Sequence, residues 1–253
     1  MKPLALAYGA LCYLIFFLTF LYAIGFVGDL VVPKSIDSGP ATALPLALAI
    51  DLALLGLFAV QHSGMARQAF KKWWTRFVPW PIERSTYVLA ASLVLILLYW
   101  AWRPLPQTIW SVQASWAVAL LWVLFFAGWG IVLISTFLIS HAELFGVSQV
   151  WAFSRGQKHQ PPQFKTPLFY KLVRHPIYFG FVVAFFAIPK MTLGHLVFAL
   201  ASTAWMLIAI QLEERDLITL FGARYLTYRT QVSMILPLPR LSRAGPPTAD
   251  QPG

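Results

Sequence analysis

Two short polar clusters stand beside apolar segments in the last third of the chain. The first runs from Arg174 to Gly180 and reads RHPIYFG, and the second is the adjacent pair Glu213 and Glu214. Ionisable groups next to apolar segments are costly in a membrane, and they usually serve a function. Guanidinium, imidazole and phenol donors together with two carboxylates can bind a ligand that carries charges and hydroxyl groups. These residues therefore predict a site for a polar, charged cofactor.

Three histidines stand at or near the ends of apolar segments. His62 follows Gln61 at the end of the second segment, His141 ends the fourth, and His175 belongs to the RHPIYFG stretch. If these ends share one membrane face, the three imidazoles offer proton acceptors there, although each is equally consistent with an ordinary interfacial residue. A metal site is the less favoured interpretation, because Cys12 is the single cysteine and no His-x-x-x-His pair occurs.

Asp51 lies in the middle of the second apolar segment. Helical spacing puts it on the same face as Phe58 and His62. Asp51 and His62 are then roughly 16 Å apart along the axis, so they are expected to line one cavity without touching. A hydrogen bond from Asp51 to a neighbouring span is an equally good explanation.

The composition identifies the environment of these residues. The chain has 253 residues, of which 59% are hydrophobic and 11% are charged, whereas a soluble domain carries about 25% charged residues. Apolar runs of about 18 or more residues recur, and each can cross the hydrocarbon core. The sequence therefore predicts an all-α fold, a polytopic membrane bundle of about five transmembrane helices.

The net charge of +10 follows from topology and does not predict a nucleic-acid partner. Most of the 19 Lys and Arg residues fall between the spans on one side, whereas only Lys34, Arg103 and Lys190 fall on the other. This asymmetry predicts a multi-pass protein with its N-terminus and its cofactor site on the cytoplasmic side, in contact with anionic lipid.

The elements divide into two regions and a tail. Residues 1–140 are predicted to form a four-span bundle that lines the substrate cavity, with spans over 5–27, 44–61, 85–102 and 115–140. Segment 65–84 interleaves basic residues with Trp, which is typical of an interfacial helix on the cytoplasmic face.

The second region, 141–237, is predicted to form the cofactor-binding region. It consists of a cytoplasmic loop, a helical hairpin over 176–214 and an amphipathic helix that follows. The first arm of the hairpin starts at Pro176, where proline suits a helix start, and it is too short to cross alone. The tail 238–253 is Pro-rich and is predicted to be disordered.

Two gapped motifs resemble a known family. Arg174 to Gly180 matches the R-H-P-x-Y-x-G motif of the isoprenylcysteine carboxyl methyltransferase-like and phospholipid methyltransferase-like membrane proteins. Residues 213–237 match the E-E-x-x-L-x-x-x-F-G-x-x-Y-x-x-Y-x-x-x-V-x-x-x-x-P signature that follows it in the family. Upstream, Leu168, Phe169 and Tyr170 stand where many relatives have Gly-Pro-Tyr.

The full-length pattern is similar to one branch, the bacterial methanethiol S-methyltransferases. The stretches that carry this similarity are 22–26, 61–63, 82–87 and 141–146. A neighbouring branch of denitrification-associated membrane proteins shares some of them. The resemblance implies a bacterial inner-membrane enzyme that transfers a methyl group from S-adenosylmethionine to a small thiol, converting methanethiol to dimethyl sulfide.

The resemblance also suggests roles for the residues. Expected cofactor contacts are Arg174, His175, Tyr178, Glu213, Glu214, Tyr170 and Arg229. A thiol is mostly protonated near pH 7, so a base is needed. His62 or His141 is expected to take the proton, with Asp51 orienting a partner or relaying protons, and Gln61 and Phe58 are expected to line the acceptor pocket.

Three alternatives remain open at this point. The acceptor can be a lipid or an isoprenylcysteine, the C-terminal architecture can belong to a membrane reductase, or the chain can be a non-enzymatic accessory protein. Competition between methanethiol and a prenylated thiol distinguishes the first. Binding of S-adenosylmethionine or of NADPH distinguishes the second. The third would bind no cofactor at all.

Overall fold

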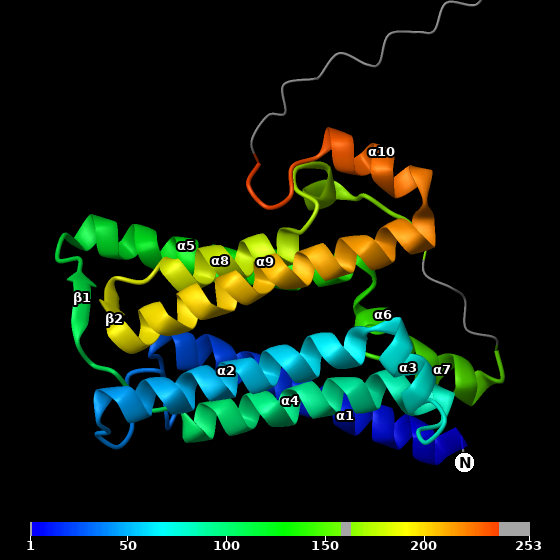
Figure 1. The fold of residues 1–253 in the computed structure, drawn as a ribbon, viewed down its shortest axis with the longest axis horizontal. Helices are drawn as coiled ribbons and strands as arrows, with labels where there is room; N and C mark the ends of the chain where they lie inside the picture. The colour runs from blue at the N-terminus through cyan, green and yellow to red at the C-terminus, as the bar shows by residue number, and fades with distance from the viewer. Residues whose placement is uncertain (1, 158–162, 238–253) are drawn as a thin grey trace, which may run out of the picture.

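The computed structural model describes residues 2–157 and 163–237, which form a helical bundle in two layers (Figure 1). Five of its helices are long and apolar enough to cross a membrane, which confirms the predicted polytopic fold. They are α1 (Lys2–Gly28), α2 (Leu44–Ala66), α4 (Glu83–Ala101, preceded by the turn η1, Trp80–Ile82), α5 (Ser115–Ile139) and α9 (Leu193–Phe221).

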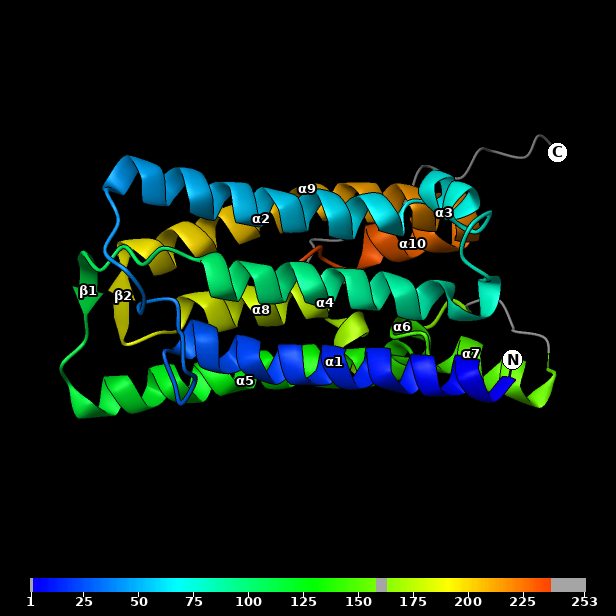
Figure 2. The same cartoon turned by 90° about the horizontal axis from the view of Figure 1, so that it is seen from below.

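The two layers face each other along the whole bundle. One layer holds α2, α4 and α1, and the other holds α9, α5 and the shorter helix α8 (Pro176–Phe186). The view from below shows the same order in both layers, with α2 over α9, α4 over α8 and α1 over α5 (Figure 2). Contacts between α2 and α9 join the layers. Side chains of α2 and α4 are therefore placed opposite those of α8 and α9.

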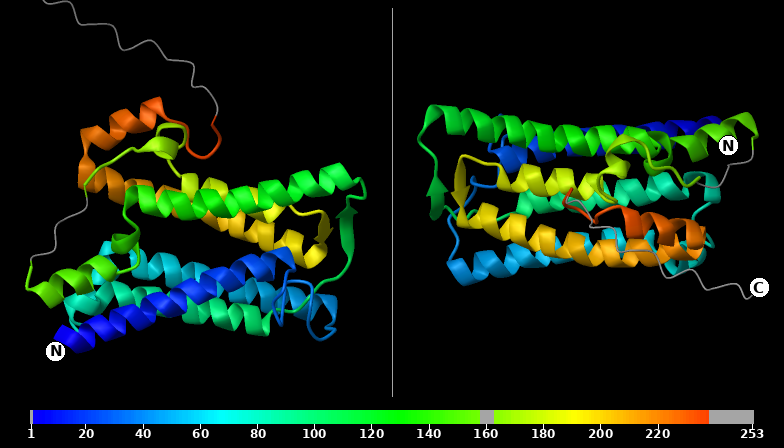
Figure 3. Two further views of the ribbon diagram at one scale, coloured as in Figure 1. Left: turned by 180° about the vertical axis from the view of Figure 1, so that it is seen from behind. Right: turned by 90° about the horizontal axis from the view of Figure 1, so that it is seen from above.

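The two ends of the bundle differ, as the views from behind and above also show (Figure 3). The N-terminal end, where α1 begins, carries the short elements α3 (Gln68–Trp74), α6 (His141–Leu144), α7 (Val147–Arg155), η2 (Leu168–Lys171) and α10 (Ala223–Gln231). The strand end carries an antiparallel pair, β1 (Thr108–Ser111) and β2 (Lys190–Thr192). Sequence reasoning missed this pair, because three or four extended residues leave no readable alternation.

The predicted hairpin is present as α8, β2 and α9. Helix α8 has 11 residues with Pro176 as its first, so it is too short to cross alone, as expected. It packs along α5, where Gly180 meets Gly128. A Cβ atom at Gly180 would lie 2.6 Å from the carbonyl oxygen of Gly128. The glycine that ends the RHPIYFG stretch is therefore needed for close backbone packing.

Two predicted segments are more structured than expected. The loop after residue 140 contains α6 and α7, and α7 packs on α1 through Val150 and Gly9. Gly146 precedes α7 with φ of 79°, and a side chain there would collide with Ser85. The interfacial segment 65–84 is divided into α3 and η1 by residues 75–79. The predicted tail 238–253 and His159 lie outside the described residues.

The core lies between the layers and is strongly aromatic. Rings from α1, α4, α5, α8 and α9 pack edge to face or tilted, with centroids about 5 to 6 Å apart; they include Phe26, Tyr99, Phe125, Trp129, Phe185 and Phe198. Large apolar side chains such as Leu14, Leu57 and Phe126 remain exposed on the outer faces of the helices. Apolar side chains on the outer faces are what a lipid-facing surface requires.

Candidate active site

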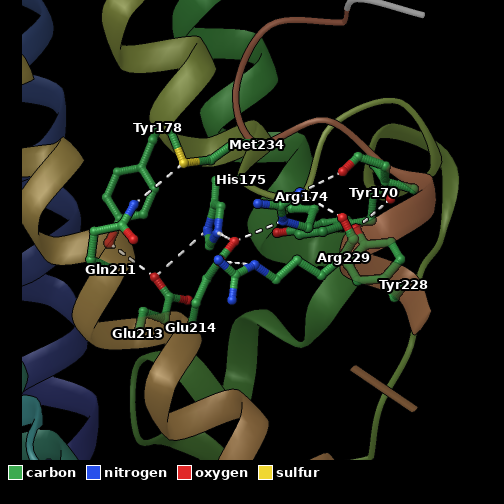
Figure 4. A network of polar contacts seen from close by, with 11 residues as sticks. Tyr170, Arg174, His175, Tyr178, Gln211, Glu213, Glu214, Tyr228, Arg229 and Met234 are labelled. Atoms are coloured by element: carbon green, nitrogen blue, oxygen red, sulfur yellow. Dashed lines mark hydrogen bonds and ion pairs between the residues drawn. The ribbon is translucent and has the colours of Figure 1, made fainter. Parts of the chain in front are cut away.

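A polar network at the N-terminal end joins the start of α8, the last third of α9 and α10 (Figure 4). The backbone N–H of Arg174 donates to Ser233 O at 2.8 Å, and that of His175 donates to Met234 O at 3.1 Å. Because the segment after α10 pairs with the residues before α8, both side chains are aimed toward α9.

Both carboxylate oxygens of Glu214 are bound by side chains of the protein itself. Its Oε1 accepts from Arg174 Nε at 2.7 Å and lies 3.2 Å from His175 Nε2, while its Oε2 pairs with Arg229 Nε at 3.1 Å. Arg174 also donates to the carbonyls of Arg229 and Val232, at 3.2 and 2.5 Å. The side chains of Arg174 and Glu214 are 4% and 3% exposed. These contacts hold three segments together.

Glu213 differs from its neighbour because its side chain is 42% exposed. Its Oε2 accepts a hydrogen bond from the Tyr178 hydroxyl at 3.1 Å and lies 3.8 Å from His175 Nδ1. Figure 4 shows Tyr178 and Glu213 together on the side of the network away from Arg229. Glu213 therefore keeps hydrogen-bonding capacity that Glu214 has used within the chain.

Tyr170 and Tyr228 extend the network behind Arg174. The Tyr228 hydroxyl donates to Tyr170 O, and the Tyr170 hydroxyl donates to Ser135 O at 3.4 Å. Burial raises the pKa of Tyr228 to about 12 and also raises that of Tyr170, so both phenols stay protonated donors. Tyr170 is thus held against α5, and its predicted cofactor contact stays a prediction.

Tyr225 is a buried residue beside this network to which sequence reasoning gave no role. Its side chain is 2% exposed, and its buried hydroxyl has no hydrogen-bond partner in the part of the chain that the structure describes. Burial raises the pKa of this phenol, with a further contribution from Glu214. Its place in the second motif was a usable signal, because one helical turn separates it from Tyr228.

His62 lies near the end of α2 and has two aromatic neighbours. The Tyr87 hydroxyl of α4 lies 3.1 Å from Nδ1, 3.2 Å from Nε2 and 3.2 Å from the backbone oxygen of His62. Phe58 stacks on the imidazole, with centroids 5.1 Å apart. Of the predicted pocket residues, Phe58 therefore contacts the predicted base.

Gln61, the other predicted pocket residue, also has unused hydrogen-bonding capacity. Its amide nitrogen donates to the sulfur of Met65 at 3.1 Å. Its Oε1 is buried and has no partner among residues 2–157 and 163–237.

The pair of His62 and Tyr87 belongs to the layer opposite the polar network. Its helices α2 and α4 lie opposite α9 and α8, which carry Glu213 and Tyr178. Tyr87 lies within electrostatic reach of Glu213. At the end of α2, Arg67 donates to Asp216 of α9 at 2.8 Å and ties the two layers together. The pair and Glu213 thus lie at the same end of the bundle, on facing layers.

His141 has different surroundings. Its Nδ1 is 2.8 Å from Thr136 Oγ1, its Nε2 is 2.8 Å from the Tyr13 hydroxyl, and Phe137 stacks on the ring at 4.1 Å. Burial lowers the pKa of His141, which favours the neutral ring. Because both nitrogens are used by the chain, the structure supplies no free acceptor here.

Asp51 is brought together with neither histidine. It is 0% exposed, and its Oδ1 accepts from the backbone N–H of Arg103 at 2.8 Å, near the strand end. Of the two explanations considered, the hydrogen bond is the one seen, although its donor lies just beyond the end of the neighbouring span α4 and not within it. Asp51 and His62, which were expected to line one cavity, have separate neighbours at different places in the bundle, and His141 has others again.

The strand end has a cavity of its own, about 180 Å³, far from this network. Asp29, Asp37, Lys190 and His195 contribute to its wall. His195 is 1% exposed, and its Nε2 bonds to Phe185 O at 2.8 Å, so it joins the start of α9 to the end of α8. This is a structural use of a histidine for which the sequence predicted no role.

The fold defines a multi-pass helical membrane protein that carries a network of polar residues at one end of its bundle. Methanethiol S-methyltransferase 1 of Bradyrhizobium diazoefficiens is 58% identical over 236 residues, which cover 93% of this chain and 83% of that protein. Methanethiol S-methyltransferase of Mycobacterium tuberculosis is 55% identical over 238 residues, 94% of this chain and 98% of that protein. The chain belongs to the methanethiol S-methyltransferase family.

A more distant relative extends the comparison to animals. Nurim of Mus musculus is 32% identical over 179 residues, covering 67% of this chain and 68% of that protein. No family model and no solved structure matches the chain. The close relatives do not favour the lipid, isoprenylcysteine or denitrification-associated alternatives.

Proposed function

We propose that the chain is a membrane methyltransferase that uses S-adenosylmethionine to convert methanethiol to dimethyl sulfide. The observation that carries the proposal is the 58% and 55% identity to two methanethiol S-methyltransferases over more than nine-tenths of the chain. The division between a saturated Glu214 and an exposed Glu213 supports it, because the site keeps ligand-binding capacity after the fold is satisfied.

The residues at the N-terminal end fit this cofactor. S-adenosylmethionine carries an ammonium, ribose hydroxyls, a carboxylate and a sulfonium, and when bound it supplies the methyl group. The exposed Glu213 carboxylate is a suitable acceptor for the ammonium or the hydroxyls. Tyr178 holds Glu213 in place and offers an aromatic face, which attracts cations by about 1–2 kcal/mol when desolvated. Arg174 and His175 contribute by fixing the network.

His62 is the proposed base. The thiol S–H bond breaks as its proton passes to an imidazole nitrogen, and the electron pair remains on sulfur as the nucleophile. Phe58 and the side chain of Gln61 supply one apolar and one polar wall of the acceptor pocket. His62 is preferred to His141, because Thr136 and Tyr13 occupy both nitrogens of His141.

The proposed orientation places the N-terminal end in the cytoplasm. Lys71, Lys72 and Arg76 lie in and just after α3 at this end, while Lys190 begins β2 at the strand end. This distribution follows the positive-inside rule. A charged cofactor that cannot cross the bilayer would then reach Glu213 from the cytoplasm, and the localisation would be a bacterial inner membrane.

The test measures dimethyl sulfide in the headspace above membranes that contain the protein. With methanethiol and S-adenosylmethionine, we expect product to form in proportion to the protein. His62→Ala should lower turnover by roughly 10²- to 10⁴-fold, the usual contribution of a positioned base, while binding of the cofactor is retained.

The control is His195→Ala, which removes a histidine from the opposite end; because His195 bonds to Phe185 O, turnover of each variant is divided by the amount of folded protein. Methylation of an isoprenylcysteine or a phospholipid in preference to methanethiol would contradict the proposed acceptor. Wild-type turnover by His62→Ala would contradict the proposed base, and failure to bind S-adenosylmethionine would contradict the cofactor.

A further inference from the structure

Tyr87 is a buried phenol whose hydroxyl contacts the proposed base, His62. Its side chain is 6% exposed within α4, and the contacts of its hydroxyl that the structure describes are all with His62. A buried hydroxyl normally needs only one partner to be satisfied. The contact of this hydroxyl with both the ring and the backbone of one residue calls for a more specific explanation.

The distances limit how the hydroxyl can act. At 3.1 and 3.2 Å from Nδ1 and Nε2, it cannot lie along the in-plane axis of both nitrogens. It can donate its hydrogen to the backbone oxygen of His62, at 3.2 Å, and keep its lone pairs toward the ring. A small rotation of the imidazole then decides which ring N–H donates to the Tyr87 oxygen. The other ring nitrogen keeps its lone pair and can accept a proton.

Phe58 limits that rotation from the other side. Its ring stacks on His62 with an angle of 24° between the planes, whereas the Tyr87 ring is tilted by 37°. The imidazole is thus held between an apolar ring of its own helix and a phenol of the neighbouring helix. Holding a base in a fixed orientation is a large part of its catalytic value.

We propose, on the basis of the proposed function, that Tyr87 is a positioning residue for His62. Its hydroxyl holds the imidazole so that one nitrogen faces the thiol. When the S–H proton moves to that nitrogen, the other N–H of the imidazolium donates to the Tyr87 oxygen. The proton later leaves His62 for solvent, and the hydroxyl ends as it began.

The surroundings of Tyr87 bear on the pH dependence of this step. The guanidinium of Arg84 lies 4.7 Å from the centre of the Tyr87 ring. Other charged or titratable groups that act on Tyr87 come from α2, α4, α8 and α9, namely Arg67, Glu83, Tyr178 and Glu213. In the proposed arrangement the Tyr87 oxygen accepts the N–H of the imidazolium and so favours the protonated ring. Removal of the hydroxyl should therefore move the acid limb of the pH–rate profile to lower pH.

The test uses Tyr87→Phe, which keeps the ring and removes the hydroxyl. With methanethiol, we expect kcat to fall roughly 10- to 100-fold, a part of the contribution of a positioned base, with the KM for S-adenosylmethionine unchanged. In the background of His62→Ala, the same substitution should cost nothing further. Tyr99→Phe is the matched control, because Tyr99 is also buried in α4 and stacks on Tyr22 instead.

A second acceptor makes the test independent of how much protein folds. The small thiol 2,2,2-trifluoroethanethiol is more acidic and needs less help from a base. The ratio of its rate to that of methanethiol, taken within one preparation, should rise in Tyr87→Phe and in His62→Ala. An unchanged ratio in Tyr87→Phe, or additive losses in the double variant, would overturn the role of Tyr87 alone. Wild-type turnover by His62→Ala would overturn the base as well.

Discussion

The Arg174–Glu214 network and the pair of His62 and Tyr87 lie at the same end of the bundle but use their polar atoms differently. In the network, both carboxylate oxygens of Glu214 are bound by side chains of the chain itself. In the pair, one hydroxyl contacts an imidazole whose in-plane positions it cannot fill. Ionisable residues of the same type thus differ in how many of their polar atoms are already bound within the chain. This difference separates groups that hold the fold from groups that still have hydrogen-bonding capacity.

The largest expected effect is the loss of Arg174. Arg174→Ala removes the buried cation from Glu214 and leaves the carboxylate with the half-exposed Arg229 and with His175, which should lower the free energy of unfolding by up to about 3–5 kcal/mol. The apparent melting temperature in detergent measures this. Arg215→Ala is the control, because Arg215 lies next to Glu214 in sequence but is exposed. Equal melting temperatures for both variants would remove the structural half of the comparison.

Neutralising each acid in turn tests the division between Glu213 and Glu214. Glu213→Gln should leave the melting temperature unchanged and raise the KM for the methyl donor roughly 10- to 100-fold, as expected for loss of a hydrogen bond to a charged group. Glu214→Gln should instead lower the melting temperature, because Arg174 and Arg229 lose their partner. The reverse pattern would show that the exposure of Glu213 misidentifies the ligand-binding acid.

A smaller effect is expected where the first motif packs on α5. Gly180→Ala puts a methyl group against Gly128 and should lower the free energy of unfolding by about 1–3 kcal/mol. Gly130→Ala is the control, because Gly130 lies on α5 two residues from Gly128 and has open space around it. If both variants melt at the wild-type temperature, the close approach of α5 and α8 is not required.

The smallest effect concerns the pH dependence of His141. Burial lowers the pKa of the His141 imidazole in the folded state. Below the unfolded pKa of about 6.5, the unfolded chain therefore binds a proton at His141 and the folded chain does not. Stability from this residue is present at higher pH and is lost as pH falls. Between pH 7.5 and 5.5 the melting temperature of the wild type should fall more than that of His141→Gln. A parallel fall in both would show that His141 is not held neutral.

Much of the fold was readable from the sequence, because a membrane imposes simple demands on it. Apolar runs long enough to cross the bilayer predicted the five long helices, and the shortness of the run after Pro176 predicted the hairpin. The strand pair and α7 were missed, since the pair joins segments about 80 residues apart and α7 is stabilised by packing on α1. Such elements are decided by their partners.

The RHPIYFG stretch and the Glu213–Glu214 pair show what the sequence by itself determined. It placed the ionisable groups at span ends on one side of the membrane, because burial of charge in lipid is costly and topology follows the basic residues. The structure brings the two clusters together as expected, with Arg174 and His175 on Glu214.

Only the tertiary structure decided which of these groups have their hydrogen-bonding capacity used within the chain. Residue type does not distinguish Glu213 from Glu214, or His62 from His141, since each pair is chemically identical. The distinction comes from neighbours on other helices: Arg174 and Arg229 for Glu214, and Tyr13 for His141. Contacts between segments far apart in the chain set hydrogen-bond saturation, so no local pattern of residues could have predicted it.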